Sequence, residues 1–164
     1  MFSYFVHMLA DLKLEPDYDG FIYLAESARN PPVLRPHRHV ELELNLVVRG
    51  AISYVVGERR ITFERGTLLW LFPAQEHVLI EHAPEFEMWI GGANPIGLRC
   101  IATDPGAKVL RQSNPAGEYC RRLSQPAFAR LDTLVAEVST ARAQPGLFNA
   151  GLNYTLLAAW NHFI

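Results

Sequence analysis

The first two thirds of the chain alternate between apolar and polar residues in short stretches that glycine and proline separate. A period of two predicts β-strands, because successive side chains of a strand point to opposite faces. Many short strands at even spacing favour a mainly β sandwich or barrel. The expected strands are 21–24, 39–48, 52–56, 60–63, 68–72, 78–80 and 86–90.

Turn residues punctuate these strands. Asn30-Pro31-Pro32 breaks the chain after the first strand, and Gly91-Gly92 ends the last one. Gly57-Glu58 lies between two strand patterns and is typical of a tight hairpin.

Beyond Ser124 the apolar residues recur at helical spacing. Ser124 and Pro126 are typical start signals for a helix, and Pro145-Gly146 ends it before a second apolar stripe from Phe148 to Phe163. We therefore expect a barrel over residues 1–123 and an antiparallel helical hairpin over residues 124–164. The second stripe reaches the last residue without a cap, which favours a chain cut from a longer one over a natural C-terminal helix.

Composition and charge restrict the classes of protein to which the chain can belong. The chain has 49% hydrophobic and 20% charged residues, as a folded domain does, and its net charge of -2 gives no basic surface for nucleic acid. Cys100 and Cys120 are too few for a disulfide framework. The N-terminus lacks a secretory signal, and no apolar stretch reaches the roughly twenty residues of a membrane helix. We expect a soluble, cytoplasmic protein without membrane contact.

The segment 39–48 has the clearest alternation. Its apolar face must be covered, either by the C-terminal helices or by a partner subunit. Its polar face carries two carboxylates and an amide, and these follow the histidines in the sequence. The apolar face consists of Leu42, Leu44, Leu46 and Val48, and the polar face of Glu41, Glu43 and Asn45.

Histidines and a carboxylate gather around this segment. His37, His39 and Glu43 are separated by even numbers, so an extended strand projects all three from one face. A second strand that brings His77 to this face completes three imidazoles and one carboxylate, a set that holds Zn, Fe, Ni or Mn. The alternative is a polar pocket lining without a metal.

Four further residues are expected to line a ligand pocket: Glu41, Asn45, Trp70 and Trp89. Glu41 either orients a histidine or is a rim carboxylate in solvent. The two tryptophans either stack on a ligand or belong to the core.

The residues resemble a known family. His37-x-His39-x3-Glu43-x6-Gly50 resembles the first cupin motif, and Gly66…Pro73…His77 resembles the second. The phrases HRHVELELNLVVRG, ITFERGTLLWLFPAQEH and FNAGLNYTLLAAW resemble the N-terminal half of AraC-type transcription regulators. This resemblance implies a cupin jelly roll that binds a small effector, and a helical pair that forms a homodimer. It also implies DNA binding through a C-terminal helix-turn-helix domain that this sequence lacks.

The resemblance places His37, His39, Glu43 and His77 at the metal-ligand positions of metal-bearing cupins. We interpret the chain as the effector-sensing and dimerisation domain of an AraC-like regulator, without catalysis. The alternative is a free-standing metal-dependent cupin enzyme of dioxygenase or isomerase type. A third reading is a metal-free cupin that binds a sugar or an aromatic acid.

Overall fold

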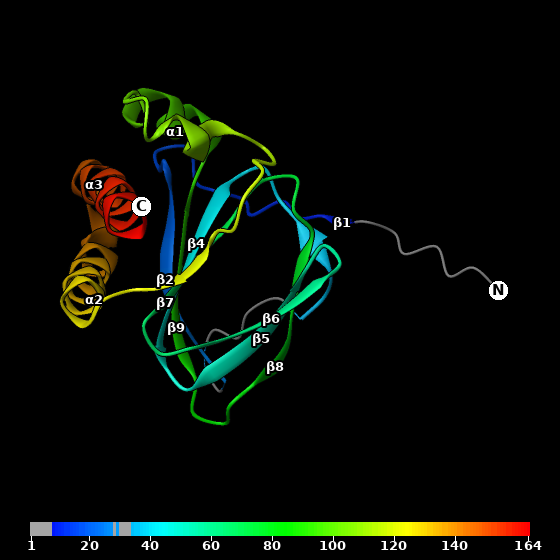
Figure 1. Cartoon of the computed structure of the whole chain (residues 1–164). Helices are drawn as coiled ribbons and strands as arrows, with labels where there is room; N and C mark the ends of the chain where they lie inside the picture. Colours follow the sequence, from blue (N-terminus) through cyan, green and yellow to red (C-terminus); the bar gives the residue numbers. More distant parts are fainter. Residues whose placement is uncertain (1–7, 28, 30–33) are drawn as a thin grey trace.

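The computed structural model describes residues 8–27, 29 and 34–164, so the Asn30-Pro31-Pro32 break lies outside the described residues. Within the described part, ten strands form two facing sheets of five (Figure 1). The first sheet has the order β1 (Met8–Leu9), β3 (His37–Arg38), β8 (His77–His82), β5 (Ala51–Val56) and β6 (Arg59–Glu64). The second has the order β10 (Cys120–Arg122), β7 (Thr67–Leu71), β4 (Leu42–Arg49), β9 (Glu87–Ala93) and β2 (Gly20–Glu26).

The two sheets and the helices after them confirm the predicted jelly-roll barrel with a C-terminal helical hairpin. The hairpin consists of α2 (Gln125–Thr140) and α3 (Pro145–Phe163), joined by the 3-10 turn η2 (Ala141–Ala143). The Ser124 side chain caps α2 by accepting a hydrogen bond from the backbone N–H of Ala127. The predicted start of the helix is therefore correct.

The helical hairpin covers the outer face of the second sheet (Figure 1). Leu42, Leu44 and Leu46 of β4 belong to the same hydrophobic cluster as Leu152 and Trp160 of α3. The sequence left open whether the C-terminal helices or a partner subunit bury this face. In the structure the C-terminal helices bury it. The barrel and the hairpin thus share one core, and the last strand is followed by helix at Ser124.

A second hydrophobic cluster fills the space between the two sheets. It includes Ile52 of β5 from the first sheet. It also includes Val47 of β4 and Met88 of β9, which alternate along their strands with residues of the outer cluster. The polar residues Glu43 and Asn45 share this inward face of β4 and are almost completely buried. The inside of the barrel is therefore apolar at one end and polar at the other.

The sequence prediction missed or misplaced several elements. β9 continues through Gly91-Gly92 instead of ending there. A Cβ atom at Gly92 would lie 2.6 Å from the carbonyl oxygen of Leu42, so glycine permits β9 to pass close to β4. The structure also contains α1 (Pro95–Ile101), the 3-10 helix η1 (Lys108–Arg111) and β10, which the pattern did not predict. None of the described helices combines the length and hydrophobicity that crossing a bilayer requires.

The contact between α3 and the second sheet leads to a stability prediction. Leu152 is fully buried in the cluster between them, whereas Leu147 on the same helix is 58% exposed. Leu152→Ala should lower the free energy of unfolding by about 2–5 kcal/mol, because it leaves a cavity. Leu147→Ala should change it by no more than about 0.5 kcal/mol. Urea denaturation of both variants measures the difference, and equal losses would contradict this packing.

Candidate functional site

Three buried histidines meet inside the barrel. His37 and His77 face each other as a pair between β3 and β8, and His39 follows β3 directly. The ring centroids of His37 and His77 lie 4.4 Å apart, those of His39 and His77 5.2 Å, and those of His37 and His39 6.0 Å. One nitrogen from each ring lies within 4.8 Å of the others. The predicted meeting of His77 with the other histidines is therefore found.

The backbone brings this cluster together differently from the prediction. Residues 39–41 leave the extended conformation and carry the chain from β3 in the first sheet to β4 in the second. His37 and Glu43 thus come from facing sheets rather than from one face of one strand. The even spacing predicted that His37 and His39 belong to one cluster, and they do. The assumption behind it, a single straight strand, is not what the structure shows.

Each of the three imidazoles is held by a backbone carbonyl. The Nδ1 atoms of His37, His39 and His77 lie 2.7, 3.0 and 3.0 Å from the carbonyl oxygens of residues 35, 41 and 75. Because a carbonyl oxygen only accepts hydrogen bonds, each Nδ1 carries the hydrogen. The Nε2 atoms of His37 and His77 are consequently available to a ligand, as in metal-binding histidines whose other nitrogen is fixed by a hydrogen bond, whereas Nε2 of His39 contacts Glu43.

Glu43 forms a buried ion pair with one of these rings. Nε2 of His39 lies 2.9 Å from Oε2 of Glu43, and the Asn45 side-chain amide donates to Oε1 at 2.7 Å. Burial alone raises the pKa of Glu43, but the hydrogen bonds and the positive charge around it lower that pKa to about 2. Burial alone lowers the pKa of His39, yet the hydrogen bond and the charge of Glu43 raise it overall. The pair is therefore a carboxylate and an imidazolium when no metal is bound.

His77 supplies an observation that bears on metal binding. Its Nε2 atom is buried and has no hydrogen-bond partner among the described residues. Burial lowers the pKa of His77, so the ring is neutral and its Nε2 lone pair is free. The three imidazoles place their nitrogen atoms close enough together to hold a divalent Zn, Fe, Ni or Mn ion. The Glu43 carboxylate, the predicted fourth ligand, lies beside this group through its contact with His39. The residues present thus fit a metal.

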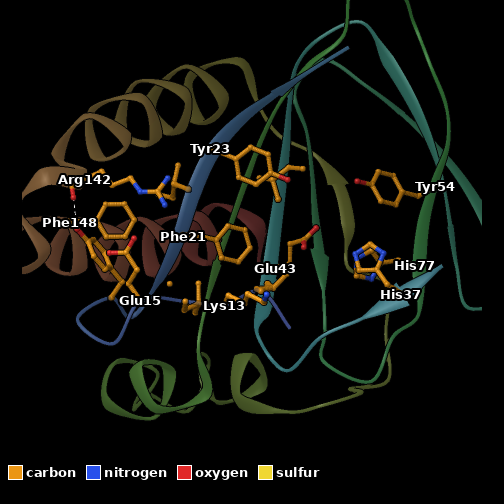
Figure 2. A pocket seen from close by; sticks show the side chains of 16 residues that line it. Lys13, Glu15, Phe21, Tyr23, His37, Glu43, Tyr54, His77, Arg142 and Phe148 are labelled. Atoms are coloured by element: carbon orange, nitrogen blue, oxygen red, sulfur yellow. Dashed lines mark hydrogen bonds between the residues drawn. The ribbon is translucent and has the colours of Figure 1, made fainter. Parts of the chain in front are cut away.

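A cavity of about 490 Å³ opens beside the histidines. Figure 2 shows His37, His77 and Tyr54 at one end and Phe148 and Arg142 at the other. Cavities of this size accommodate small organic ligands. The lining comes from residues 12–15, from β2, from single residues of other strands and from the hairpin: Leu12, Lys13, Leu14, Glu15, Tyr18, Gly20, Phe21, Ile22, Tyr23, His37, Glu43, Tyr54, His77, Ile90, Arg142 and Phe148.

Comparison with protein-family models matches residues 20–137 to the AraC-like ligand-binding domain. This segment contains the cavity strands, the histidine cluster and most of α2. The chain belongs to the AraC-like ligand-binding domain family. No curated protein sequence matches it.

Solved structures of regulators share the fold of this AraC-like domain. The AraC-like transcriptional activator CuxR aligns with a TM-score of 0.50 and 9% identity, over 87% of this chain and 48% of that chain. Apo ToxT K231A from Vibrio cholerae strain SCE256 aligns with a TM-score of 0.52 and 4% identity, over 89% and 58%. Wild-type ToxT from the same strain, bound to an unsaturated fatty acid, gives 0.52 and 5%, over 88% and 55%. The chain spans about half the length of these regulators.

The two tryptophans that were expected in the pocket lie elsewhere in the AraC-like domain. Trp70 pairs with Leu44, and Trp89 pairs with Leu46, so both share the outward apolar face of the second sheet. Trp70 packs edge-on against Trp160 of α3, and the indole N–H of Trp89 donates to Asp132 of α2 at 2.8 Å. Neither lines the cavity beside the histidines; of the two places that the sequence left open, both occupy the core, in the layer between sheet and helices.

Glu41 and Asn45 lie beside the histidine cluster but do not line the cavity. The Glu41 carboxylate is 3.6 Å from Nδ1 of His39, and its Oε2 atom has no hydrogen-bond partner within the described part of the chain. Of its two predicted places, it occupies the one next to a histidine rather than a solvent-exposed rim. Asn45 orients Glu43. Both residues act on the cluster rather than on a ligand in the cavity.

The sequence prediction missed the aromatic wall of the cavity. Phe21 and Tyr23 point inward from β2, and Tyr54 points inward from β5. Their alternation with outward-facing residues such as Leu24 was visible in the sequence. Assigning the inward face requires the pairing of β2 with β9, which connects strands far apart in the chain.

The histidine geometry leads to a metal-binding prediction. The chain should bind one equivalent of Zn²⁺ or Co²⁺, and His77→Gln should weaken this binding by at least about tenfold, since loss of a group that merely supports a ligand already costs that much. His82→Gln is the matched control, because His82 is exposed at the other end of the same strand. Isothermal titration of chelator-treated protein measures both affinities. Equal affinities of the two variants would exclude His77 as a ligand.

Proposed function

We propose that this domain senses a small effector and forms the dimer in an AraC-type transcription regulator. The observation that carries the proposal is the position of the second sheet. Its inner face lines the cavity through Phe21, Tyr23 and Glu43, and its outer face supports α2 and α3. A ligand that changes the strands on one side therefore acts on the helices on the other.

A direct link also connects the cavity wall with α3. The segment that leads into β2 lines the cavity through Tyr18 and Gly20. The backbone N–H of Asp19 donates to Oδ1 of Asn149 at 2.9 Å, and the Asn153 amide donates to the Asp19 carboxylate at 3.2 Å. Movement of this segment on ligand binding is thus passed to α3 through hydrogen bonds. Such coupling requires that the ligand binds one helix arrangement more tightly than another.

The proposed dimer contact is the solvent-facing side of α3. The apolar stripe from Phe148 to Phe163 is buried against the sheet, so it does not serve a partner subunit. Leu147 and Tyr154 lie two helical turns apart on the opposite side, and they are 58% and 52% exposed. We assign them to the interface with a second copy of the chain.

A divalent metal fits the same proposal. His37, His39, His77 and Glu43 would hold it at the polar end of the cavity. When bound, it supplies a Lewis acid that an oxygen atom of the effector can coordinate. The protein itself fixes the three rings through the carbonyl contacts at Nδ1 and keeps Glu43 ionised.

The alternative function is that of a free-standing metal-dependent enzyme, and the histidine cluster beside a cavity is the observation in its favour. Glu43 is the carboxylate nearest to the cluster in the cavity lining, and both of its oxygens already accept hydrogen bonds. It is therefore a poor general base. Mass spectrometry of a bound compound after incubation separates the two functions, because a sensor returns it unchanged and an enzyme converts it.

The DNA-binding part of the proposal concerns residues beyond this sequence. The coding sequence after Ile164 should continue into two helix-turn-helix units. A stop codon at that place would count against the regulator and leave a stand-alone binding protein.

The main experimental test is whether a ligand changes self-association. A thermal-shift screen of sugars, carboxylic acids and metals identifies a compound that stabilises the chain, and sedimentation velocity then gives the dimer dissociation constant with and without it. We expect a change of about fivefold or more, the usual lower limit of allosteric coupling. A chain that stays monomeric under both conditions would refute the dimerisation part.

The link through α3 leads to a specific prediction. The double variant Asn149→Ala, Asn153→Ala should bind the compound as tightly as the wild type, because neither residue lines the cavity, yet lose most of the effect on self-association. Asn161→Ala, at an exposed position near the end of α3, is the control and should retain the effect. Full coupling in the double variant would show that the signal does not pass through these hydrogen bonds.

A further inference from the structure

Two tyrosines that the proposed function does not use lie at the polar end of the cavity. Tyr23 comes from β2 and Tyr54 from β5, so they belong to facing sheets. Figure 2 shows their hydroxyl groups pointing toward each other across the cavity, beside Glu43 and His77. The rings of Tyr54 and His77 have a centroid distance of 6.3 Å. The two phenols therefore frame the space in front of the histidine cluster.

Neither hydroxyl has a hydrogen-bond partner among the described residues, although both side chains line the cavity. Glu43 does not accept a hydrogen bond from either hydroxyl, because its oxygens already accept from His39 and Asn45. Both hydroxyls therefore remain free to donate to a molecule in the cavity.

Both hydroxyls are donors at ordinary pH. Burial, and then the negative charge of Glu43, raise the pKa of Tyr23 and of Tyr54, so both stay protonated. Two hydrogen-bond donors that converge on one space are best satisfied by a group with two acceptor oxygens, and a carboxylate is such a group.

The charges around the cavity permit an anion. Two cationic side chains, Lys13 and Arg142, line the cavity together with the carboxylates of Glu15 and Glu43. With two positive and two negative side chains the lining is formally neutral, so it does not exclude an anion.

Part of the remaining wall is apolar and offers few partners to a ligand with many hydroxyls. This part includes Leu12, Leu14, Phe21 and Ile90. A sugar would leave most of its hydroxyls without partners along such a wall, which is costly. An apolar body beside one charged head group fits both parts of the lining.

We propose that Tyr23 and Tyr54 bind the carboxylate of the effector, and that this effector is a small monocarboxylic acid with an apolar body. The assignment rests on the proposed sensing function and specifies the ligand class of its cavity. Tyr23 and Tyr54 then determine specificity, because they distinguish an acid from an alcohol of the same shape.

Isothermal titration of the purified chain tests this assignment. The probes are benzoate and octanoate, each compared with its neutral analogue, benzyl alcohol or 1-octanol, and with glucose as a polyhydroxy compound. We expect at least one acid to bind at least tenfold more tightly than its alcohol and more tightly than glucose. An alcohol that binds as tightly as its acid would overturn the assignment.

Single variants then locate the carboxylate. Tyr23→Phe and Tyr54→Phe should each weaken binding of the acid about tenfold or more, the loss expected for one hydrogen bond to a charged group. They should weaken binding of the neutral alcohol much less than that of the acid, because a hydrogen bond to an uncharged oxygen is worth less. The melting temperature of each variant without ligand serves as the control for an intact fold. Tyr119→Phe is the matched control, because its hydroxyl donates to the carbonyl oxygen of Ala116 outside this cavity.

The outcomes separate this inference from the function on which it rests. If glucose binds and the acids do not, the cavity still senses a ligand but the carboxylate assignment is wrong. The same conclusion follows if the acids bind equally well to wild type and to both phenylalanine variants. If no compound of any class binds, the sensing function fails as well.

Discussion

The alternation along β4 is the constraint on which the rest of the structure depends. Leu42, Leu44 and Leu46 point to the helices, while Glu43 and Asn45 point into the barrel. A shift of one residue in the register would exchange these two sets and place charged groups under the hairpin. β4 lies between β7 and β9 in the second sheet, so its register is fixed on both sides. The polar site and the helical layer are therefore two faces of one strand.

The polar end of the barrel is retained at an energetic cost. Burying Glu43 requires a partner, and His39 and Asn45 supply hydrogen bonds to both carboxylate oxygens. Buried ion pairs contribute little net stability compared with apolar residues of the same volume. Acceptor atoms of Glu41, Asn45 and His77 remain without a hydrogen bond from any described residue. A cluster with such vacant acceptors is better explained by ligand binding than by folding, and family membership gives the same interpretation.

Local patterns in the sequence predicted local structure well. Gly57, with a φ of 59°, forms the hairpin turn between β5 and β6, and Ser124 caps α2. The cluster residues were also predicted, because each carries a distinctive functional group. Their geometry was not, since the bend after β3 depends on pairing between distant strands. The same limit explains Trp70, Trp89 and Tyr54, whose faces follow from long-range register rather than from local spacing.

Amide hydrogen exchange tests most directly whether the cavity and the hairpin are coupled. The chain is compared with and without saturating Zn²⁺ or the tightest-binding small molecule, and protection is followed in β2, β4 and α3. The account predicts that protection changes in Pro145–Phe163 together with the cavity strands, because Asp19 and the second sheet connect them. A change confined to the strands around the histidines, with α3 unaffected, would contradict it.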